Sequence, residues 1–123
     1  MAGAMDLAGA EAVPVVTDPD EAKAAAVAEE IRAAGGKAEG LALGAGNAEA
    51  VTRAIVKVAS RGWLDILHSH AGIQVSGGLE EASIADIDAS STMNVQAHFV
   101  AAKAAMRQMK AQRSGSIIIT ALN

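Results

Sequence analysis

Residues 13–36 read VPVVTDPDEAKAAAVAEEIRAAGG, a β-branched run followed directly by an amphipathic one. The β-branched residues predict a short strand, because side chains of this kind favour extended backbone. Asp18 is expected to cap the helix that follows, with Pro19 at the first helical position and Glu21 completing a capping box. The apolar side chains expected on the inner face of this helix are Ala24, Val27, Ala28 and Ile31.

Three further strand-like segments follow, at residues 38–43, 64–69 and 116–120. The last carries three successive Ile residues, a continuous apolar run typical of a parallel strand covered on both faces. Strands that alternate with helices indicate an α/β fold, a parallel sheet with helices on both faces. We predict a single domain over residues 1–123. Ligands bind such sheets at the carboxyl ends of the strands, so we look for functional residues there.

Two helices are expected between these strands. Ser83 and Asp86 form a second capping box, which opens a long helical stretch that runs to about Arg113. The length of this stretch predicts a break or bend near Asn94. The shorter helix is expected to be capped by Asn47. Its predicted inner face consists of Val51, Ala54, Ile55, Val58 and Ala59.

The composition excludes several kinds of chemistry. The chain contains no Cys, which rules out disulfides, thiolate metal sites and a cysteine nucleophile, and it contains no Tyr, which rules out a phenol acid or base. Ten basic against fourteen acidic residues give a net charge of −4, so nucleic acid is not an expected partner. No apolar run approaches the roughly 18 residues of a membrane span. The amino terminus lacks the pattern of a secretory signal. We therefore expect a soluble, cytoplasmic protein without membrane contact.

Several short motifs follow one another along the chain: Val15-Val16-Thr17-Asp18, Gly35-Gly36-Lys37-Ala38, Leu64-Asp65-Ile66-Leu67, Ala71-Gly72-Ile73, Met93-Asn94-Val95, Lys103-Ala104-Ala105 and Gly115-Ser116-Ile117-Ile118. Their order and spacing resemble the short-chain dehydrogenase/reductase family over about residues 7–121. The resemblance implies an NAD(P)-dependent oxidoreductase lineage and a Rossmann-like parallel sheet of about four strands.

The resemblance also implies roles for four residues. In the family, an acid at the position of Asp18 accepts hydrogen bonds from the adenosine ribose, and a carboxylate there repels a 2′-phosphate and favours NAD over NADP. Ala71 and Gly72 keep the close backbone approach to the cofactor. Asn94 is the one member of the family's catalytic set present, in a supporting role. The alternatives are that Asp18 only caps its helix and that Asn94 is a polar residue at a helix bend.

The chain departs from the family at both ends and at two internal motifs. The first strand and its Gly-rich turn are missing, since residues 7–13 resemble only the end of the helix that follows that turn. The catalytic Ser and the Tyr-x-x-x-Lys pair are also missing. Gly44-Ala45 stands where the family has Asp-Val, and Ser69-His70 stands where it has two Asn that steady the turn.

These departures predict a truncated Rossmann-like domain that does not transfer hydride by itself. A first alternative is that the chain is part of a longer, active NAD-dependent alcohol or ketone oxidoreductase, which would take a small-molecule substrate. A second alternative is a non-catalytic nucleotide-binding or assembly module. Whether the chain is an enzyme is thus left open, and no substrate can be assigned.

The sequence GAGNAE at residues 44–49 imitates a dinucleotide-binding fingerprint, with Asp65 as the acid that follows at a distance. Glu49 stands where the third glycine would be, and its carboxylate would repel a pyrophosphate. We therefore favour a turn with Asn47 as a helix cap.

His68 and His70 could face the same way at a strand end and bind a metal. Asp65 lies on the opposite face of an extended strand, and His98 falls on the Phe99 side of the long helix. We therefore predict no metal site, and interpret the histidines as ordinary loop and surface residues.

Two features predict a homo-oligomer. In the related family the missing first strand lies in the middle of the sheet, and unpaired strand edges promote association. In addition, an apolar stripe runs along the long helix and is interpreted as core or, where exposed, as a subunit interface. Its residues are Met93, Val95, Phe99, Ala102, Met106 and Met109.

Overall fold

The computed structural model describes residues 4, 9 and 12–120. The chain divides into two compact units, Met1–Gly44 and Ala45–Asn123, which are described separately. Compactness alone does not define a domain, so the single domain over residues 1–123 stays a prediction. The helix end expected at residues 7–13 falls mostly outside the described residues.

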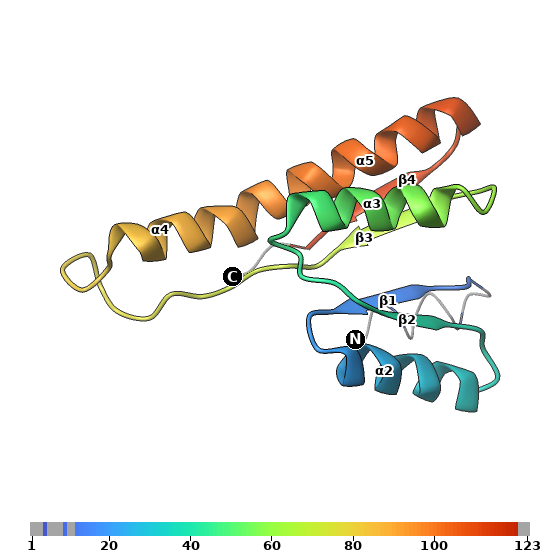
Figure 1. Cartoon of the computed structure of the whole chain (residues 1–123), viewed down its shortest axis with the longest axis horizontal. Helices are drawn as coiled ribbons and strands as arrows, with labels where there is room; N and C mark the ends of the chain where they lie inside the picture. The colour runs from blue at the N-terminus through green and yellow to red at the C-terminus, as the bar shows by residue number, and fades with distance from the viewer. Residues whose placement is uncertain (1–3, 5–8, 10–11, 121–123) are drawn as a thin grey trace. The chain divides into compact units, whose positions relative to one another are not determined.

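The first unit consists of two parallel strands and one helix (Figure 1). Strand β1 (Val15–Asp18) pairs with β2 (Glu39–Ala42), and helix α2 (Glu21–Ala33) packs on both strands. Gly40 permits this packing, because a Cβ atom at this position would lie 2.8 Å from the backbone oxygen of Ala24. The predicted inner face of the helix is confirmed: Ala24, Val27, Ala28 and Ile31 are all buried.

The start of α2 differs from the prediction. Asp20, not Asp18, is the N-cap, and its side chain accepts a hydrogen bond from Ala22 N at 2.9 Å. A proline disfavours helical backbone in the residue before it, so Pro19 keeps Asp18 extended as the last residue of β1. The placement of Asp18 as cap, Pro19 at the first helical position and Glu21 in a capping box was therefore wrong.

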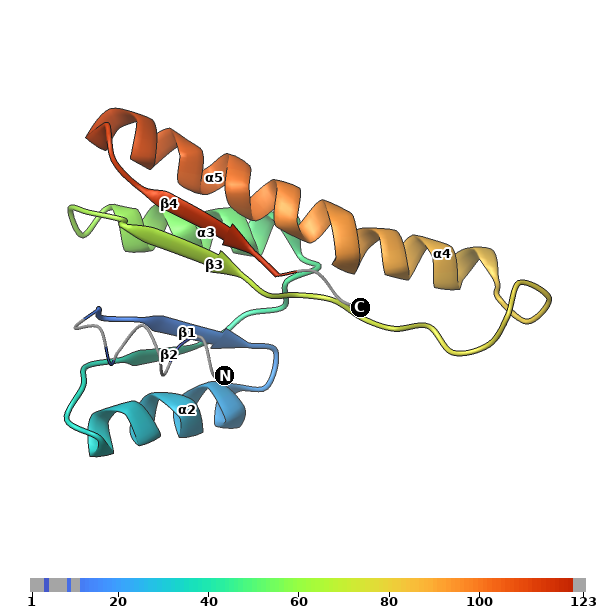
Figure 2. The same ribbon diagram turned by 180° about the vertical axis from the view of Figure 1, so that it is seen from behind.

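The second unit also contains a parallel strand pair. Strand β3 (Ile66–Ser69) pairs with β4 (Ser116–Ile119), and Figure 2 shows the two side by side from behind. Helix α3 (Ala48–Ala59) is capped by Asn47 as predicted, and its predicted inner face is buried or half-buried. It packs beside the long helix, which in turn contacts β3.

The long helix has three parts: α4 (Ile84–Ser91), the π-helical segment η1 (Thr92–Gln96) and α5 (Ala97–Gln112). The π-helical segment confirms the break predicted near Asn94. The capping box of Ser83 and Asp86 is also confirmed. Hydrogen bonds from the backbone and hydroxyl of Ser83 hold the pKa of the Asp86 carboxyl below its ordinary value of 3.8.

The four predicted strands are all present and parallel, but they form two pairs in place of one continuous ladder. Strand β4 has β3 as its neighbour, and Ile118 and Ile119 are 45% and 52% exposed. The expectation that β4 is covered on both faces was therefore wrong for the described part of the chain, which leaves about half of each of these two side chains accessible.

Candidate functional site

Asp18 lies at the carboxyl end of β1, where parallel strands present their ligand-binding residues. Its backbone oxygen accepts a hydrogen bond from Leu43 N at 2.9 Å, which ties this end of β1 to the residue after β2. Its Oδ1 accepts one from Asp20 N at 2.8 Å. Oδ2 has no hydrogen bond within the described residues. Because Asp20 caps the helix, the half-buried Asp18 carboxylate keeps an oxygen that can accept a ligand hydroxyl.

The surroundings of Asp18 in the sequence are acidic. Asp20 and Glu21 follow within three residues, and Pro19, between Asp18 and Asp20, carries no charge. Both are exposed at the start of α2. Each carboxylate repels an anion brought to this strand end, while a neutral hydroxyl can donate a hydrogen bond to a carboxylate oxygen. This end of β1 therefore suits a hydroxyl-bearing ligand group better than a phosphate.

The second candidate segment is the loop that follows Ser69, the last residue of β3, at residues 70–73. Ala71 and Gly72 lie at its centre and are half-buried. Ile73 is held through both of its backbone polar groups by one side chain: its N–H donates to Asn94 Oδ1 at 2.9 Å, and its oxygen accepts from Asn94 Nδ2 at 3.0 Å. The same Nδ2 donates to Ser90 Oγ at 3.0 Å.

These contacts define the position of Asn94. It lies in η1, at the helix break, and its amide bonds to both backbone polar groups of Ile73 and to Ser90 in α4. Both interpretations made from the sequence are compatible with this geometry, since a polar residue at a helix bend can also support a site. What the side chain does in this structure is position a backbone segment.

Ser69 and His98 hold the other end of the same loop, and the sequence did not identify them as a pair. Ser69 Oγ and His98 Nδ1 lie 2.7 Å apart and share a buried hydrogen bond. The prediction of His98 as a surface residue beside Phe99 was wrong: His98 is 7% exposed, whereas Phe99 is 66% exposed. A signal was present, because small apolar residues at intervals of four, Ala97, Ala101 and Ala105, mark the buried side of α5.

The two other histidines lie at the end of β3. His68 Nε2 is 3.0 Å from Thr120 Oγ1, and the rings of His68 and His70 stack with centroids 5.7 Å apart. Across the described residues, no three His, Asp or Glu side chains gather where they could share a metal ion.

The turn at residues 44–49 is a turn with a helix cap, as favoured from the sequence. Asn47 Oδ1 accepts from Ala50 N at 3.1 Å, and Glu49 forms an ion pair with Arg53 at 2.7 Å. A Cβ atom at Gly46 would lie 3.1 Å from Met93 Sδ, so this glycine allows the turn to pack against η1. The residues of this fingerprint-like sequence are thus explained by the helix cap at Asn47 and by the packing of Gly46 against η1.

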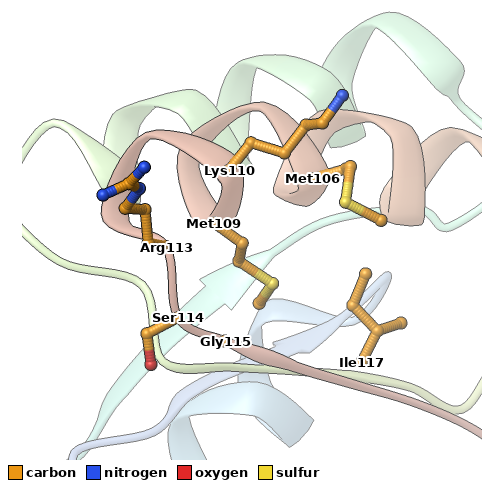
Figure 3. A pocket seen from close by; sticks show the side chains of 7 residues that line it. All are labelled: Met106, Met109, Lys110, Arg113, Ser114, Gly115 and Ile117. Carbon is orange, nitrogen blue, oxygen red and sulfur yellow. The ribbon is translucent and has the colours of Figure 1, made fainter.

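A groove of about 430 Å³ lies where α5 ends and β4 begins (Figure 3). Met106, Met109 and Ile117 form its apolar wall, and Lys110 and Arg113 lie at its rim. The groove is at the amino end of β4, whereas ligands of parallel sheets bind at the carboxyl ends. We therefore favour one candidate segment in each unit over this groove: Asp18 in the first unit and the loop after β3 in the second.

The chain is similar to known proteins over most of its length. A family model described as short chain dehydrogenase matches residues 1–122. An uncharacterized oxidoreductase of Thermotoga maritima is 36% identical over 105 residues, which cover 84% of this chain and 41% of the relative. The 2,5-dichloro-2,5-cyclohexadiene-1,4-diol dehydrogenase LinX of Sphingobium indicum is 38% identical over 105 residues, which cover 85% of this chain and 42% of the relative. The chain thus spans less than half the length of these curated relatives.

Solved structures confirm the Rossmann-like α/β fold. A metagenomic short-chain oxidoreductase in complex with NADP has a TM-score of 0.88 and 34% identity, over 94% of this chain and 53% of the other. None of the helices in the described part of the chain is long and apolar enough to cross a membrane.

Proposed function

Because the chain belongs to the short-chain dehydrogenase family, we propose that it binds a nicotinamide dinucleotide through Asp18 and the loop at Ala71 and Gly72. The observation that carries the proposal is the Asp18 carboxylate at the carboxyl end of β1. Asp20 takes over the helix cap, so Asp18 Oδ2 is left to accept a ribose hydroxyl.

We propose NAD as the preferred form of the cofactor. NADP differs by a 2′-phosphate, and the carboxylates of Asp18, Asp20 and Glu21 would repel it. The metagenomic relative is in complex with NADP, so family membership alone does not decide the choice. The acidic end of β1 favours NAD in this chain.

In the proposed function, the residues of this chain bind the cofactor and orient it. A bound nicotinamide dinucleotide would accept or donate the hydride. The backbone at Ala71 and Gly72 would lie against it, and Asn94 holds that backbone through Ile73. Asn94 thus serves as a positioning residue.

We propose that these 123 residues bind the cofactor without turnover by themselves, because they contain no Tyr and the family's reaction uses one as proton donor. The activity proposed for the whole protein is NAD-dependent oxidation of an alcohol or reduction of a ketone.

Calorimetric titration of the purified chain with NAD, NADP and ADP tests the binding proposal. We expect heat of binding with NAD and a weaker response with NADP, and no heat with any of the three would refute it. Assays of NADH formation with a panel of alcohols test the second part, since turnover by these 123 residues would contradict it. The intact mass of the natural protein separates a short binding protein from a longer enzyme.

A separate observation supports self-association. The outer face of the long helix exposes five large apolar side chains, each between 46% and 77% accessible: Ile84, Ile87, Val95, Phe99 and Met106. An exposed apolar stripe of this kind on a helix is typical of a subunit interface. We propose a second copy of the chain as its partner, and multi-angle light scattering that shows a monomer at all concentrations would refute this.

A further inference from the structure

The hydrogen bond between Ser69 and His98 joins two polar side chains that are both buried, at 9% and 7% exposure. They are the two polar residues classed as buried within the described part of the chain. Ser69 is the last residue of β3 and His98 is near the start of α5, 29 positions further on. The bond therefore fixes one point on the strand to one point on the helix.

A buried polar pair of this kind adds little to stability. A hydrogen bond inside a protein replaces hydrogen bonds to water, so two apolar side chains of similar shape would pack about as well. A hydrogen bond and an apolar contact differ in how strongly they depend on direction. A hydrogen bond of 2.7 Å holds its two atoms in one relative position, whereas apolar surfaces can slide. The pair is thus suited to setting the position of the backbone next to it.

The backbone next to it is the loop at residues 70–73. Ser69, just before the loop, is held by His98, and Ile73, at its end, is held by Asn94. Both holding residues come from the same helix, about one turn apart, on either side of the point where η1 passes into α5. The loop is therefore attached at its two ends to the same long helix.

We propose that Ser69 and His98 are positioning residues for the cofactor-binding backbone at Ala71 and Gly72. The proposal rests on the proposed function for the ligand, although the positioning itself is a property of the free chain. It also explains how the loop keeps its shape without the two Asn side chains that the family uses there, because a side chain from α5 supplies the contact.

The test compares variants of the full 123-residue chain that separate stability from positioning. Ser69→Ala and His98→Leu each leave a partner unpaired, and the double variant replaces the pair with an apolar contact. His98→Asn keeps a hydrogen-bonding atom near the place of Nδ1. Ser76→Ala in the exposed part of the following loop is the matched control.

Three measurements are made on each variant: urea unfolding, the backbone amide signals of Ala71 and Gly72 by NMR, and NAD affinity by calorimetry. We expect the double variant to unfold at about the same urea concentration as the wild type, while both amide signals broaden and NAD binds about tenfold more weakly. His98→Asn and Ser76→Ala should keep sharp signals and wild-type affinity.

Unchanged amide signals in the double variant would overturn the proposal. Losses of signal and of NAD affinity that only follow the loss of stability, and that His98→Asn does not rescue, would also overturn it. If a single variant fails to fold, the double variant decides. If the wild-type chain binds no NAD, the proposed function fails, and the amide signals of the free chain still decide the positioning role.

Discussion

Replacement of Gly40 by Ala should destabilise the first unit, because helix α2 lies directly on this residue of β2. The added Cβ atom would lie 2.8 Å from Ala24 O, 2.9 Å from Ala24 C and 3.0 Å from Ala25 N. These are backbone atoms of α2, so no side-chain rotation relieves the overlap. The helix would have to move by roughly 0.6 Å to reach a contact of 3.4 Å.

The magnitude follows from what that movement disturbs. Val27 and Ile31, 2% and 1% exposed, form the same helix-to-strand contact, so α2 cannot shift without loosening them. Overpacking of a tight core costs about 1–3 kcal/mol, and the stiffer unfolded chain of an alanine variant offsets about 0.4–1 kcal/mol. We expect the free energy of unfolding to fall by about 1–2 kcal/mol.

The assay is urea unfolding followed by circular dichroism and by amide NMR signals of the first unit. Fluorescence of Trp63 is unsuitable, because the one tryptophan belongs to the second unit. Gly44→Ala is the matched control, since a Cβ atom there has no atom within 4 Å in the same chain. Equal stability of the Gly40→Ala and Gly44→Ala variants would show that α2 does not pack on β2 as closely as the structure describes.

Three other predictions concern charge and assembly. Asp18→Asn should reduce the preference for NAD over NADP by about tenfold, because two unit charges about 4 Å apart repel by about 1–4 kcal/mol. An unchanged ratio of the NAD and NADP affinities in competition titrations would show that Asp18 is not part of the ribose site. The lowered pKa of Asp86 means that its charged form stabilises α4 at pH values above 3.8, and that this contribution is lost as the pH falls through the lower folded value. A carbon-13 NMR titration should therefore give an Asp86 midpoint below 3.8 that rises in Ser83→Ala, and a midpoint at or above 3.8 would contradict the cap. Phe99→Asp should reduce the mass seen by light scattering to that of a monomer, and an unchanged oligomer would place the interface elsewhere.

The helices were predictable because their apolar residues repeat at helical spacing. The four residues expected on the inner face of α2 are all buried, and the caps at Asn47 and Ser83 lie where their sequences indicate. These features depend on residues within one or two turns of one another, so a local pattern contains all the information. The same holds for the break at Asn94, where one helix would otherwise have been unusually long.

The cap of α2 was misplaced because two local rules conflict at Pro19. A proline is favourable at the first position of a helix, and it also forces the residue before it into extended backbone. Asp18 and Asp20 are both good caps, so the sequence offers two starts that differ by two residues. The structure keeps Asp18 in β1, and this outcome is what leaves its carboxylate available for a ligand.

Contacts between distant segments were not predictable from one sequence. The partners Ser69 and His98 are 29 positions apart, and their pairing depends on how α5 packs against β3. The exposure of the apolar stripe was not predictable either. Helical spacing showed that Val95, Phe99 and Met106 share a face, but a period in the sequence does not show whether that face is covered. In the described chain it is open to solvent.

The long helix connects the candidate site with the proposed interface. On its inner side, Asn94 and His98 hold the two ends of the loop that contains Ala71 and Gly72. On its outer side, Val95 and Phe99, the residues next to these two, are 63% and 66% exposed. A partner that covers the outer side would restrict the same two turns of helix from which Asn94 and His98 project. Because the loop is attached to this helix at both ends, its geometry depends on how straight and how ordered the helix is. The proposed assembly and the proposed cofactor binding would therefore act on the same stretch of backbone, and the π-helical segment η1 lies within it.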